Sequence, residues 1–512
     1  MGADYFAVQE KFYQGMTRQP NILIIYADQM RYDAMGCAGN PVIKTANIDR
    51  LSEEGVHFSE AYTSYPLCCP FCASVLTGKY AQRHGMIQNH FPLQDGQGFL
   101  AEYFRDAGYR TGYIGKWHLE GGPKPGFVPR DRRFGFDHFI GFNRGHSYRS
   151  SIYYDDDGQA YHSARYEPDY QTDQLMEFID NAVKAGDSKP FLGYISYGPP
   201  HFPMDMPDYL RRIYKPEEVP LPPGVPDSDL QARVQKYRNE VLCGGDGRAG
   251  HKSHASHETK KVGEVETEAE IREFIAEYYG MIHNIDWNVG RILNQLDGLG
   301  LTNDTVVVFM SDHGDMCGQH GSFCGIKNQA YRAAMHVPLI VRYPARFQPK
   351  RTEAMVDVGV DMMATLLELV GIEMPDGRDS QSYLPVLEGT SETARDSIWY
   401  QVFTQTGGNP REFAPFAERG VRTKDWLYMR RKDHRAMLFD QRNDRDEQHN
   451  LVNDPAYAKL MDEFDSNLDS HMKATGDDWV MAADFPPPDW VTHEEAEVYL
   501  QKVLLPNSIN VP

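Results

Sequence analysis

Short apolar runs alternate with longer amphipathic segments along most of the chain. The runs of strand length are predicted at 21–27, 110–114, 191–196, 305–310 and 337–342. Helices are predicted at 100–107, 170–185, 271–296 and 360–369. This alternation predicts an α/β fold with a large mixed, mostly parallel sheet sandwiched by helices. In such sheets, ligands bind beyond the carboxyl ends of the strands, so the polar residues that follow each apolar run become candidate site residues.

The pattern changes in two places. Residues 242–270 are rich in Gly, Lys, Glu and His and predict an exposed insertion, where His251, His254 and His257 recur at every third position. Metal binding by these histidines is one interpretation, but we expect a solvated loop. From about residue 396, strands bearing Trp and Tyr are predicted at 397–403, 420–428 and 435–439, followed by a helix at 456–475.

These changes predict three regions. A catalytic α/β domain spans 20–395 and carries the insertion at 242–270. A small C-terminal α+β subdomain with a short antiparallel sheet spans 396–475, and an extended tail spans 476–512. The proline-rich tail is consistent with a homo-oligomer and equally with a monomer.

Charge and cysteine content narrow the classes of partner. The 512 residues include 52 Lys and Arg against 73 Asp and Glu, a net charge of −21. This balance argues against nucleic acid or an anionic membrane as partner, because both need a basic surface. The polar first 19 residues and the seven unevenly spaced cysteines predict a cytoplasmic protein with reduced thiols, among them Cys37 and Cys243. A small anionic substrate would then be held by local cations or a metal.

The most informative segment is PLCCPFCASVLTG at 66–78, which places Cys68, Cys69 and Cys72 within five positions. A small-residue, helix-prone run follows and ends at Gly78. The N-terminus of a helix offers unpaired N–H groups and a positive partial charge, which lower the pKa of a thiol and bind anions. The segment therefore predicts a nucleophile at the start of a helix.

Two polar pairs follow two predicted strands: Asp28 with Gln29, and Asp312 with His313. Carboxylate and amide oxygens with one imidazole suit one divalent metal ion, Ca²⁺ or Mn²⁺, and the imidazole slightly favours Mn²⁺. The alternative is that Asp28 caps a helix and that residues 311–314 form a turn. Because the cysteine segment accompanies both pairs, we expect the metal site.

Four further side chains predict a cradle for a tetrahedral oxyanion: Lys116, His118, His201 and Lys327. Lys116 and His118 lie two positions apart, so they face the same way if the strand continues. His201 lies in a proline-rich loop, and Lys327 lies in the glycine-rich run after Asp312. The lysines supply charge, and the histidines supply groups for acid–base chemistry near neutral pH.

An ordered set of motifs resembles the type I sulfatases of the alkaline phosphatase superfamily: PNILIIYADQMRYDAMGCAGN, PLCCPFCASVLTG, GKWHL, GPPHFP, NIDWNVGRIL, SDHGDMCGQHG and MLFDQRNDRDEQHNL. The resemblance implies a metal-dependent hydrolase of sulfate esters in which Cys68 is oxidised to formylglycine. It implies that Asp28, Gln29, Asp312 and His313 bind the metal, with Cys68 beside it. Lys116, His118, His201 and Lys327 would hold the sulfate and protonate the leaving group.

The chain departs from the family signature at Cys72, where the family has an arginine. Three outcomes stay open: Cys68 is oxidised with another cation compensating, Cys68 stays a thiol or a metal ligand while water attacks, or turnover is weak or absent. The alternative functions are accordingly a phosphodiester or phosphonate monoester hydrolase and a degenerate sulfatase scaffold. Cys69 or Cys72 could pair with Cys317 or Cys324, although ordinary packing is expected. Polar candidates to contact the substrate alcohol are Asn89, His90, His146 and Tyr148.

Overall fold

The computed structural model describes residues 19–89, 91–121, 124–163, 165–225, 267–403 and 417–479. It also describes the backbone of two short strands, β8 (His251–Lys252) and β9 (Thr259–Lys260). His254, His257, His90, Cys243 and nearly all of the predicted tail lie outside the described residues, so the predictions made for them are not addressed by the structure.

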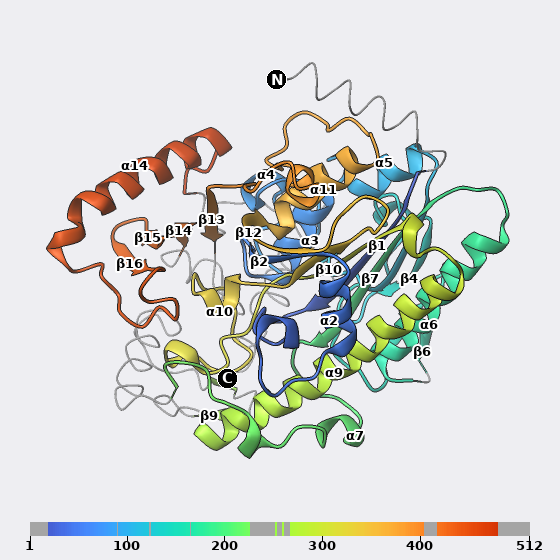
Figure 1. The fold of residues 1–512 in the computed structure, drawn as a ribbon, viewed down its shortest axis with the longest axis horizontal. Helices are drawn as coiled ribbons and strands as arrows, with labels where there is room; N and C mark the ends of the chain where they lie inside the picture. Colours follow the sequence, from blue (N-terminus) through green and yellow to red (C-terminus); the bar gives the residue numbers. More distant parts are fainter. Residues whose placement is uncertain are drawn as a thin grey trace, which may run out of the picture.

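A ten-stranded sheet forms the centre of the molecule, in the order β12-β2-β11-β10-β1-β7-β3-β4-β5-β6 (Figure 1). Its strands are β1 Asn21–Asp28, β2 Val56–Tyr62, β3 Arg110–Lys116, β4 His138–Phe142, β5 Ile152–Tyr154, β6 Ala160–His162, β7 Phe191–Pro200, β10 Thr305–Ser311, β11 Leu339–Arg342 and β12 Lys350–Asp357. The central strands β10, β1, β7, β3 and β4 run parallel. The carboxyl ends of these five strands therefore meet at one edge.

Helices cover both faces of the sheet. The helices are α2 Ala46–Glu53, α3 Cys68–Thr77, α4 Ala81–His84, α5 Leu100–Asp106, α6 Glu167–Lys184, α7 Asp208–Arg211, α9 Glu268–Gly298, α10 Arg332–Met335, α11 Val358–Leu369, α12 Leu384–Leu387 and α14 Ala458–Thr475. Short 3-10 turns are η1 Gly36–Ala38, η2 Arg130–Arg132, η3 Pro216–Glu218, η5 Thr302–Asp304, η6 Gln319–Gly321 and η8 Pro455–Tyr457. Figure 1 shows α3, α5 and α11 on one side of the sheet and α2, α6 and α9 on the other.

Strand β1 shows why the central strands are apolar throughout. Ile22, Ile24 and Tyr26 pack with the α3 and α11 layer. Leu23, Ile25 and Ala27 pack with the α6 and α9 layer. Because both faces are covered, every position is buried, and β1 appears in the sequence as a continuous apolar run rather than as an alternating one.

The C-terminal region forms a four-stranded antiparallel sheet in the order β13-β14-β15-β16, with α14 against it (Figure 1). Its strands are β13 Ser397–Val402, β14 Glu418–Thr423, β15 Trp426–Arg431 and β16 Arg435–Asp440. The predicted fold class, a large mixed sheet with a small antiparallel one, is confirmed.

Several predicted elements differ in detail. The single strand predicted at 420–428 is wrong: Lys424 and Asp425 form a two-residue turn, in which Thr423 Oγ1 accepts from the N–H of Trp426 at 3.0 Å. Helix α9 begins at Glu268, so the last residues of the predicted insertion are helical. Strand β3 ends at Lys116, and His118 has a left-handed φ of 58°. The strand does not continue to His118, so alternation does not explain its direction.

Among the described residues, no helix combines the length and the apolar character needed to cross a membrane.

Candidate active site

Two buried strand ends supply a cluster of metal-ligating side chains. Asp28 ends β1, while Asp312 and His313 follow β10, the neighbouring parallel strand. Each of Asp28, Cys68, Asp312 and His313 offers one ligand atom, and these atoms lie within 4.8 Å of one another. All four side chains are buried. The parallel pairing of β1 with β10 thus joins residues that are remote in sequence.

The chemistry of this donor set fits a divalent cation. Burial raises the pKa of Asp28, and the nearby charge of Asp312 raises it further, although Lys116 opposes both effects. Burial disfavours a charged His313, but Asp312 outweighs this and raises the pKa of the imidazole to about 10. The carboxylates of Asp28 and Asp312 repel each other, and Asp312 favours protonation of the neighbouring His313. A divalent cation would neutralise the carboxylates instead. The residues therefore fit the metal that the sulfatase resemblance implies.

Gln29 reaches the same cluster from a strained position. Its φ is 68°, and its backbone N–H donates to Asp312 Oδ1 at 2.8 Å. Its side-chain Nε2 donates to Asp315 Oδ2 at 2.6 Å, which leaves Oε1 to accept from Lys327 Nζ at 3.0 Å. Asp315 thus fixes the direction in which the amide oxygen points.

The candidate nucleophile lies at the first residue of helix α3. The cap residue Leu67 has no side-chain capping bond, but Asn89 Oδ1 accepts from the N–H of Cys69 at 3.1 Å. Pro70 lies in the first turn, where a missing N–H costs little, and Gly78 ends the helix with a left-handed φ of 63°. This local sequence holds Cys68 at the helix N-terminus, as predicted from the motif.

Cys68 is surrounded by the predicted site residues. Its Sγ lies 3.4 Å from His313 Nε2, 3.6 Å from Asp28 Oδ1 and 3.6 Å from Lys327 Nζ. The side chain is 1% exposed. A reactive group at this position would therefore face the metal ligands and a lysine at once.

The two neighbouring cysteines have different surroundings. Cys69 Sγ donates to the carbonyl oxygen of His118 at 2.8 Å. Burial, and next the charge of Asp312, raise the pKa of Cys72 well above its ordinary value, so it stays a neutral thiol. The described cysteines are all free thiols, and the alternative pairing with Cys317 or Cys324 is not formed. Cys72 therefore supplies no positive charge where the family has an arginine.

Lys116 is delivered to the site by the close approach of β3 to β7. Gly115 has a φ of 119°, and a Cβ there would come within 2.2 Å of the carbonyl oxygen of Ser196. At the end of β3, Lys116 Nζ donates to Asp28 Oδ2 at 2.5 Å. Burial disfavours the ammonium, but Asp28 outweighs it and raises the pKa of Lys116. This lysine therefore remains charged.

The hydrogen bonds of His201 assign its tautomer. Its Nδ1 lies 2.5 Å from the carbonyl oxygen of Phe202, so Nδ1 carries the proton. Its Nε2 lies 2.5 Å from Lys327 Nζ and accepts from it. Burial, and next the charge of Lys327, lower the pKa of His201 well below its ordinary value. His201 is thus a neutral acceptor that orients Lys327.

Direct contacts join eight of the predicted site residues in one buried region at the strand ends: Asp28, Gln29, Cys68, Lys116, His201, Asp312, His313 and Lys327. His118 is 7% exposed, and its N–H donates to the carbonyl oxygen of Asn143, beside Lys116 and the cysteine helix. Of the polar candidates for the substrate alcohol, Asn89 contacts helix α3 and His146 stacks on His201. Tyr148 is fully buried and donates to the carbonyl oxygen of His201 at 2.8 Å.

Two residues that support the predicted metal ligands were not predicted from the sequence. Tyr26 OH donates to Asp312 Oδ2 at 2.7 Å, and burial followed by the charge of Asp28 raises the pKa of this phenol well above its ordinary value. Asp315 orients Gln29 and accepts from the N–H of Gly325 at 2.9 Å. Tyr26 lies within an apolar run, two positions before Asp28. Residues two apart share one face of a strand, and this spacing could have pointed to Tyr26. Asp315 is three residues beyond Asp312 and had no distinguishing signal.

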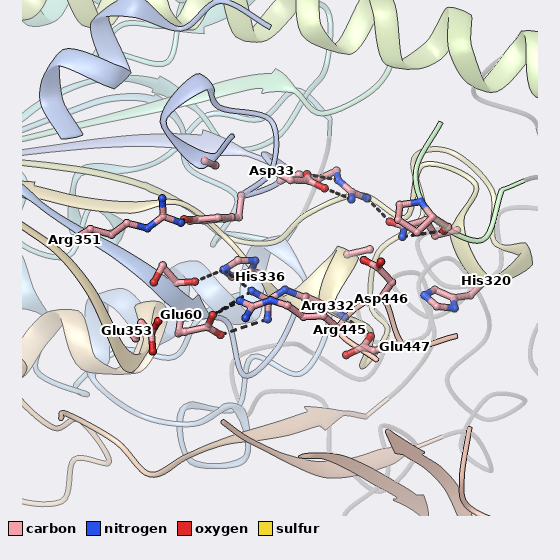
Figure 2. Close-up of a pocket in the computed structure, with 17 residues that line it drawn as sticks. Asp33, Glu60, His320, Arg332, His336, Arg351, Glu353, Arg445, Asp446 and Glu447 are labelled. Atoms are coloured by element: carbon pink, nitrogen blue, oxygen red, sulfur yellow. Dashed lines mark hydrogen bonds and ion pairs between the residues drawn. The ribbon is translucent and has the colours of Figure 1, made fainter. Parts of the chain in front are cut away.

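A second group of charged residues lines a cavity of about 670 Å³ beside β2, β12 and α10 (Figure 2). Arg31 donates to both carboxylate oxygens of Asp33, at 2.7 and 2.5 Å. Arg332 and Arg445 both bind Glu60. We call this the paired-charge cavity, because Figure 2 shows Arg332 and Arg445 beside the carboxylate of Glu60.

Comparisons with known proteins agree with this geometry. A family model described as Sulfatase matches residues 20–372, and one described as N-sulphoglucosamine sulphohydrolase, C-terminal, matches residues 318–474. The ulvan-active sulfatase of Formosa agariphila is 31% identical over 470 residues, which cover 91% of this chain and 83% of that protein.

Solved structures extend the similarity to three dimensions. A protein in complex with its substrate D-glucosamine-2-N,6-O-disulfate matches with a TM-score of 0.68 and 25% identity, over 90% of this chain and 99% of that chain. The phosphonate monoester hydrolase of Agrobacterium radiobacter matches with a TM-score of 0.71 and 22% identity, over 89% and 96% of the two chains. At 22% identity, the latter likeness shows a shared fold alone.

Proposed function

The chain belongs to the sulfatase family and hydrolyses sulfate esters; we propose that its substrate is a sulfated carbohydrate and that formylglycine made from Cys68 is its nucleophile. The position of Cys68 at the start of α3, facing Asp28, His313 and Lys327, is the observation that carries this proposal. The ulvan-active relative and the disulfated glucosamine complex of a structural neighbour support a sugar as the leaving group.

The nucleophile would be the hydrated aldehyde, a geminal diol. One hydroxyl attacks sulfur and the sugar alcohol leaves; the second hydroxyl then loses its proton and expels sulfate, which regenerates the aldehyde. A plain thiolate at Cys68 could also attack, but its sulfur adduct has no second hydroxyl with which to collapse. Turnover therefore favours the modified residue.

Asp28, Gln29, Asp312 and His313 would hold the divalent cation, which would supply a Lewis acid for the sulfate ester. Lys116 and Lys327 add positive charge around the ester, where negative charge develops in the transition state. Lys327 is oriented for this task by Gln29 Oε1 and His201 Nε2.

His118 is the better candidate for protonating the leaving oxygen. In the described arrangement, His201 Nε2 accepts from Lys327 and has no proton to give. If His118 is the acid, the variant His118→Ala should lose more kcat/KM with poor leaving groups than with good ones. A series of aryl sulfates of rising phenol pKa measures this, and an equal loss across the series would assign the proton to another group.

Matched aryl esters test the substrate class. We expect the kcat/KM for an aryl sulfate to exceed that for the matching aryl phosphate diester and aryl phosphonate monoester. The second candidate function, phosphonate or phosphodiester hydrolysis, has its support in the fold shared with phosphonate monoester hydrolase. A preference for either phosphorus ester would replace sulfate hydrolysis by that function.

The missing arginine has its own test. Cys72 stays neutral in the present site, so Cys72→Arg would add a charge one helical turn from Cys68. If the native site has lost efficiency, this variant should raise both the fraction of Cys68 converted and kcat. A fall in both would mean that the site is built around a small neutral side chain at this position.

A further inference from the structure

His118, the candidate acid, has a strained backbone that its surroundings must hold in place. Strand β3 ends at Lys116, and His118 has a φ of 58°, in the left-handed region that residues other than glycine rarely adopt. Such a conformation is costly and persists only where neighbouring groups fix it. The imidazole can be directed at a leaving group only if this backbone stays where it is. Two residues fix it, one at its N–H and one at its carbonyl oxygen.

Asn143 holds the N–H of His118 and the turn that follows. Its backbone carbonyl oxygen accepts from the N–H of His118, and its Oδ1 accepts from the N–H of Glu120 at 3.1 Å. Its Nδ2 donates to the carbonyl oxygen of Gly121. The side chain is 1% exposed, so these polar groups would be costly to leave unpaired. Asn143 thus binds three of the four residues from His118 to Gly121.

Cys69 holds the carbonyl oxygen of His118 from helix α3. Its Sγ donates to this oxygen at 2.8 Å and lies 3.3 Å from the carbonyl oxygen of Asn89. Burial, and next the neighbouring Cys68, raise the pKa of Cys69 well above its ordinary value, so the thiol keeps the proton that it donates. Because a thiol has one proton, the nearer carbonyl oxygen, that of His118, is the better acceptor.

The same contact joins the candidate acid to the candidate nucleophile. Cys69 directly follows Cys68 in the first turn of α3, so one helix end carries both the reactive residue and the donor to His118. The N–H of Cys69 donates to Asn89 Oδ1 at 3.1 Å, which ties this helix end to a further loop. A shift of His118 away from Cys68 would break the hydrogen bond to Cys69. The separation between the acid and the attacking group is therefore restrained by this bond.

We propose that Cys69 and Asn143 are positioning residues that hold His118 for protonation of the leaving group. This inference rests on the role of acid proposed for His118. Both residues act through the backbone of His118 and not on the reacting atoms. Loss of either contact releases the left-handed conformation and lets the imidazole move from the leaving oxygen, which weakens proton transfer more than attack on sulfur.

The first measurement is the dependence of activity on the leaving group. Across a series of aryl sulfates of rising phenol pKa, Cys69→Ala should lose about tenfold more kcat/KM with the poorest leaving group than with the best. Cys69→Ser keeps a hydrogen-bond donor and should restore most of this loss. In the His118→Ala background, Cys69→Ala should not steepen the dependence further. The fraction of Cys68 that is converted scales all substrates equally, so incomplete maturation of a variant cannot imitate the effect.

Amide hydrogen exchange gives a second measurement that needs no turnover. The N–H of His118 should exchange about tenfold faster in Cys69→Ala and in Asn143→Ala than in the wild type, and Cys69→Ser should restore its protection. Ser74→Ala is the matched control, because Ser74 is buried in the same helix but contacts His84 Nε2, at 3.2 Å. The control should change neither the exchange rate nor the dependence on the leaving group.

The outcomes separate this inference from the function on which it rests. An equal loss across the series in Cys69→Ala, beside a selective loss in His118→Ala, would overturn the positioning role. Unchanged exchange at His118 in both Cys69→Ala and Asn143→Ala would overturn it as well. An equal loss in His118→Ala itself would instead refute the proposed acid, and a wild type that cleaves no aryl sulfate would refute the proposed function. In either case the exchange rates still decide whether Cys69 and Asn143 fix the backbone of His118.

Discussion

The active site and the paired-charge cavity contain similar side chains but use them in opposite ways. In the cavity, Arg31 is satisfied by Asp33, and Glu60 is shared by Arg332 and Arg445 (Figure 2). In the active site, Lys116 binds Asp28, while Asp28, Asp312 and Lys327 surround Cys68, so that its sulfur faces ligand atoms and an ammonium. The ion pairs of the cavity stabilise the folded domain, whereas the charged groups around Cys68 are arranged to bind a ligand.

The comparison shows why cavity size and charge count are poor guides to function. The cavity of about 670 Å³ has many ionisable residues, yet Arg31, Arg332 and Arg445 are each bound to a carboxylate of the cavity wall. Burial would raise the pKa of Glu60, but Arg332 outweighs it and keeps the carboxylate ionised. The active site instead holds two histidines whose pKa values are shifted in opposite directions, that of His313 upward by Asp312 and that of His201 downward by burial.

The first prediction separates activity from stability. Cys68→Ala should reduce kcat/KM for an aryl sulfate at least about 1,000-fold, because the covalent step is lost. The melting temperature should change little, because Lys327, which contacts Cys68 Sγ, keeps its hydrogen bonds to Gln29 Oε1 and His201 Nε2. Activity assays and thermal unfolding of the same preparation check both parts. Residual activity above a few per cent of wild type would mean that another nucleophile operates.

The second prediction concerns the paired-charge cavity, where we expect a substitution to lower stability and leave activity unchanged. Arg332→Met should lower the free energy of unfolding by about 3–5 kcal/mol, because Glu60 would lose its more buried partner. The kcat/KM of the folded enzyme should stay near wild type.

Arg445→Met is the matched control, since Arg445 binds the same carboxylate but is 60% exposed against 17% for Arg332. We expect it to cost less than about 1 kcal/mol in urea unfolding. Equal costs for the two variants would show that burial does not govern the cavity.

The third prediction concerns the metal. Ca²⁺ or Mn²⁺ at about one hundred times its Kd should raise the free energy of unfolding of metal-free protein by about 2.7 kcal/mol. Asp312→Asn should abolish this increment, whereas Arg332→Met should retain it. Denaturation with and without a chelator measures the difference, and an increment that survives Asp312→Asn would place the cation elsewhere.

The fourth and smallest effect is a pH dependence in the cavity. Burial, and next the charge of Arg332, hold the pKa of His336 well below 6.5. Below pH 6.5 the unfolded chain takes up a proton that the folded one does not, so stability falls as pH falls. His336→Gln should remove about 1.4 kcal/mol of this loss per pH unit.

Urea unfolding at pH 5 and pH 7.5 measures that slope, and His434→Gln is the control because His434 is 51% exposed. The same slope in wild type and His336→Gln would refute the assignment. The kcat/KM of His336→Gln should keep the wild-type pH profile, because His336 lies outside the converging cluster.

The two regions also differ in how far sequence could predict them. Asp28 and Asp312 follow apolar runs of strand length, so the parallel-sheet rule brought them together without coordinates. Arg332 and Glu60 are 272 residues apart and follow no such rule, so their ion pair left no local signal. His118 was selected because of its motif, but its left-handed φ ended the strand alternation on which its direction had been inferred.

The sequence also did not predict the residues that support the metal ligands or the short turn between β14 and β15. Tyr26 and Asp315 orient the metal ligands through contacts of high sequence separation. The turn at Lys424 and Asp425 has no glycine or proline, so β14 and β15 read as one strand. In each case, the feature is defined by contacts in the folded protein and not by the local sequence pattern.

The mass of the tryptic peptide at 51–79, released by cleavage after Arg50 and Lys79, tests the central claim most directly. It carries Cys68, Cys69 and Cys72. In enzyme that releases sulfate, we predict that Cys68 has exchanged its sulfur for an aldehyde oxygen, so that alkylation adds two groups. Three alkylatable thiols in fully active protein would contradict formylglycine and assign attack to a different nucleophile.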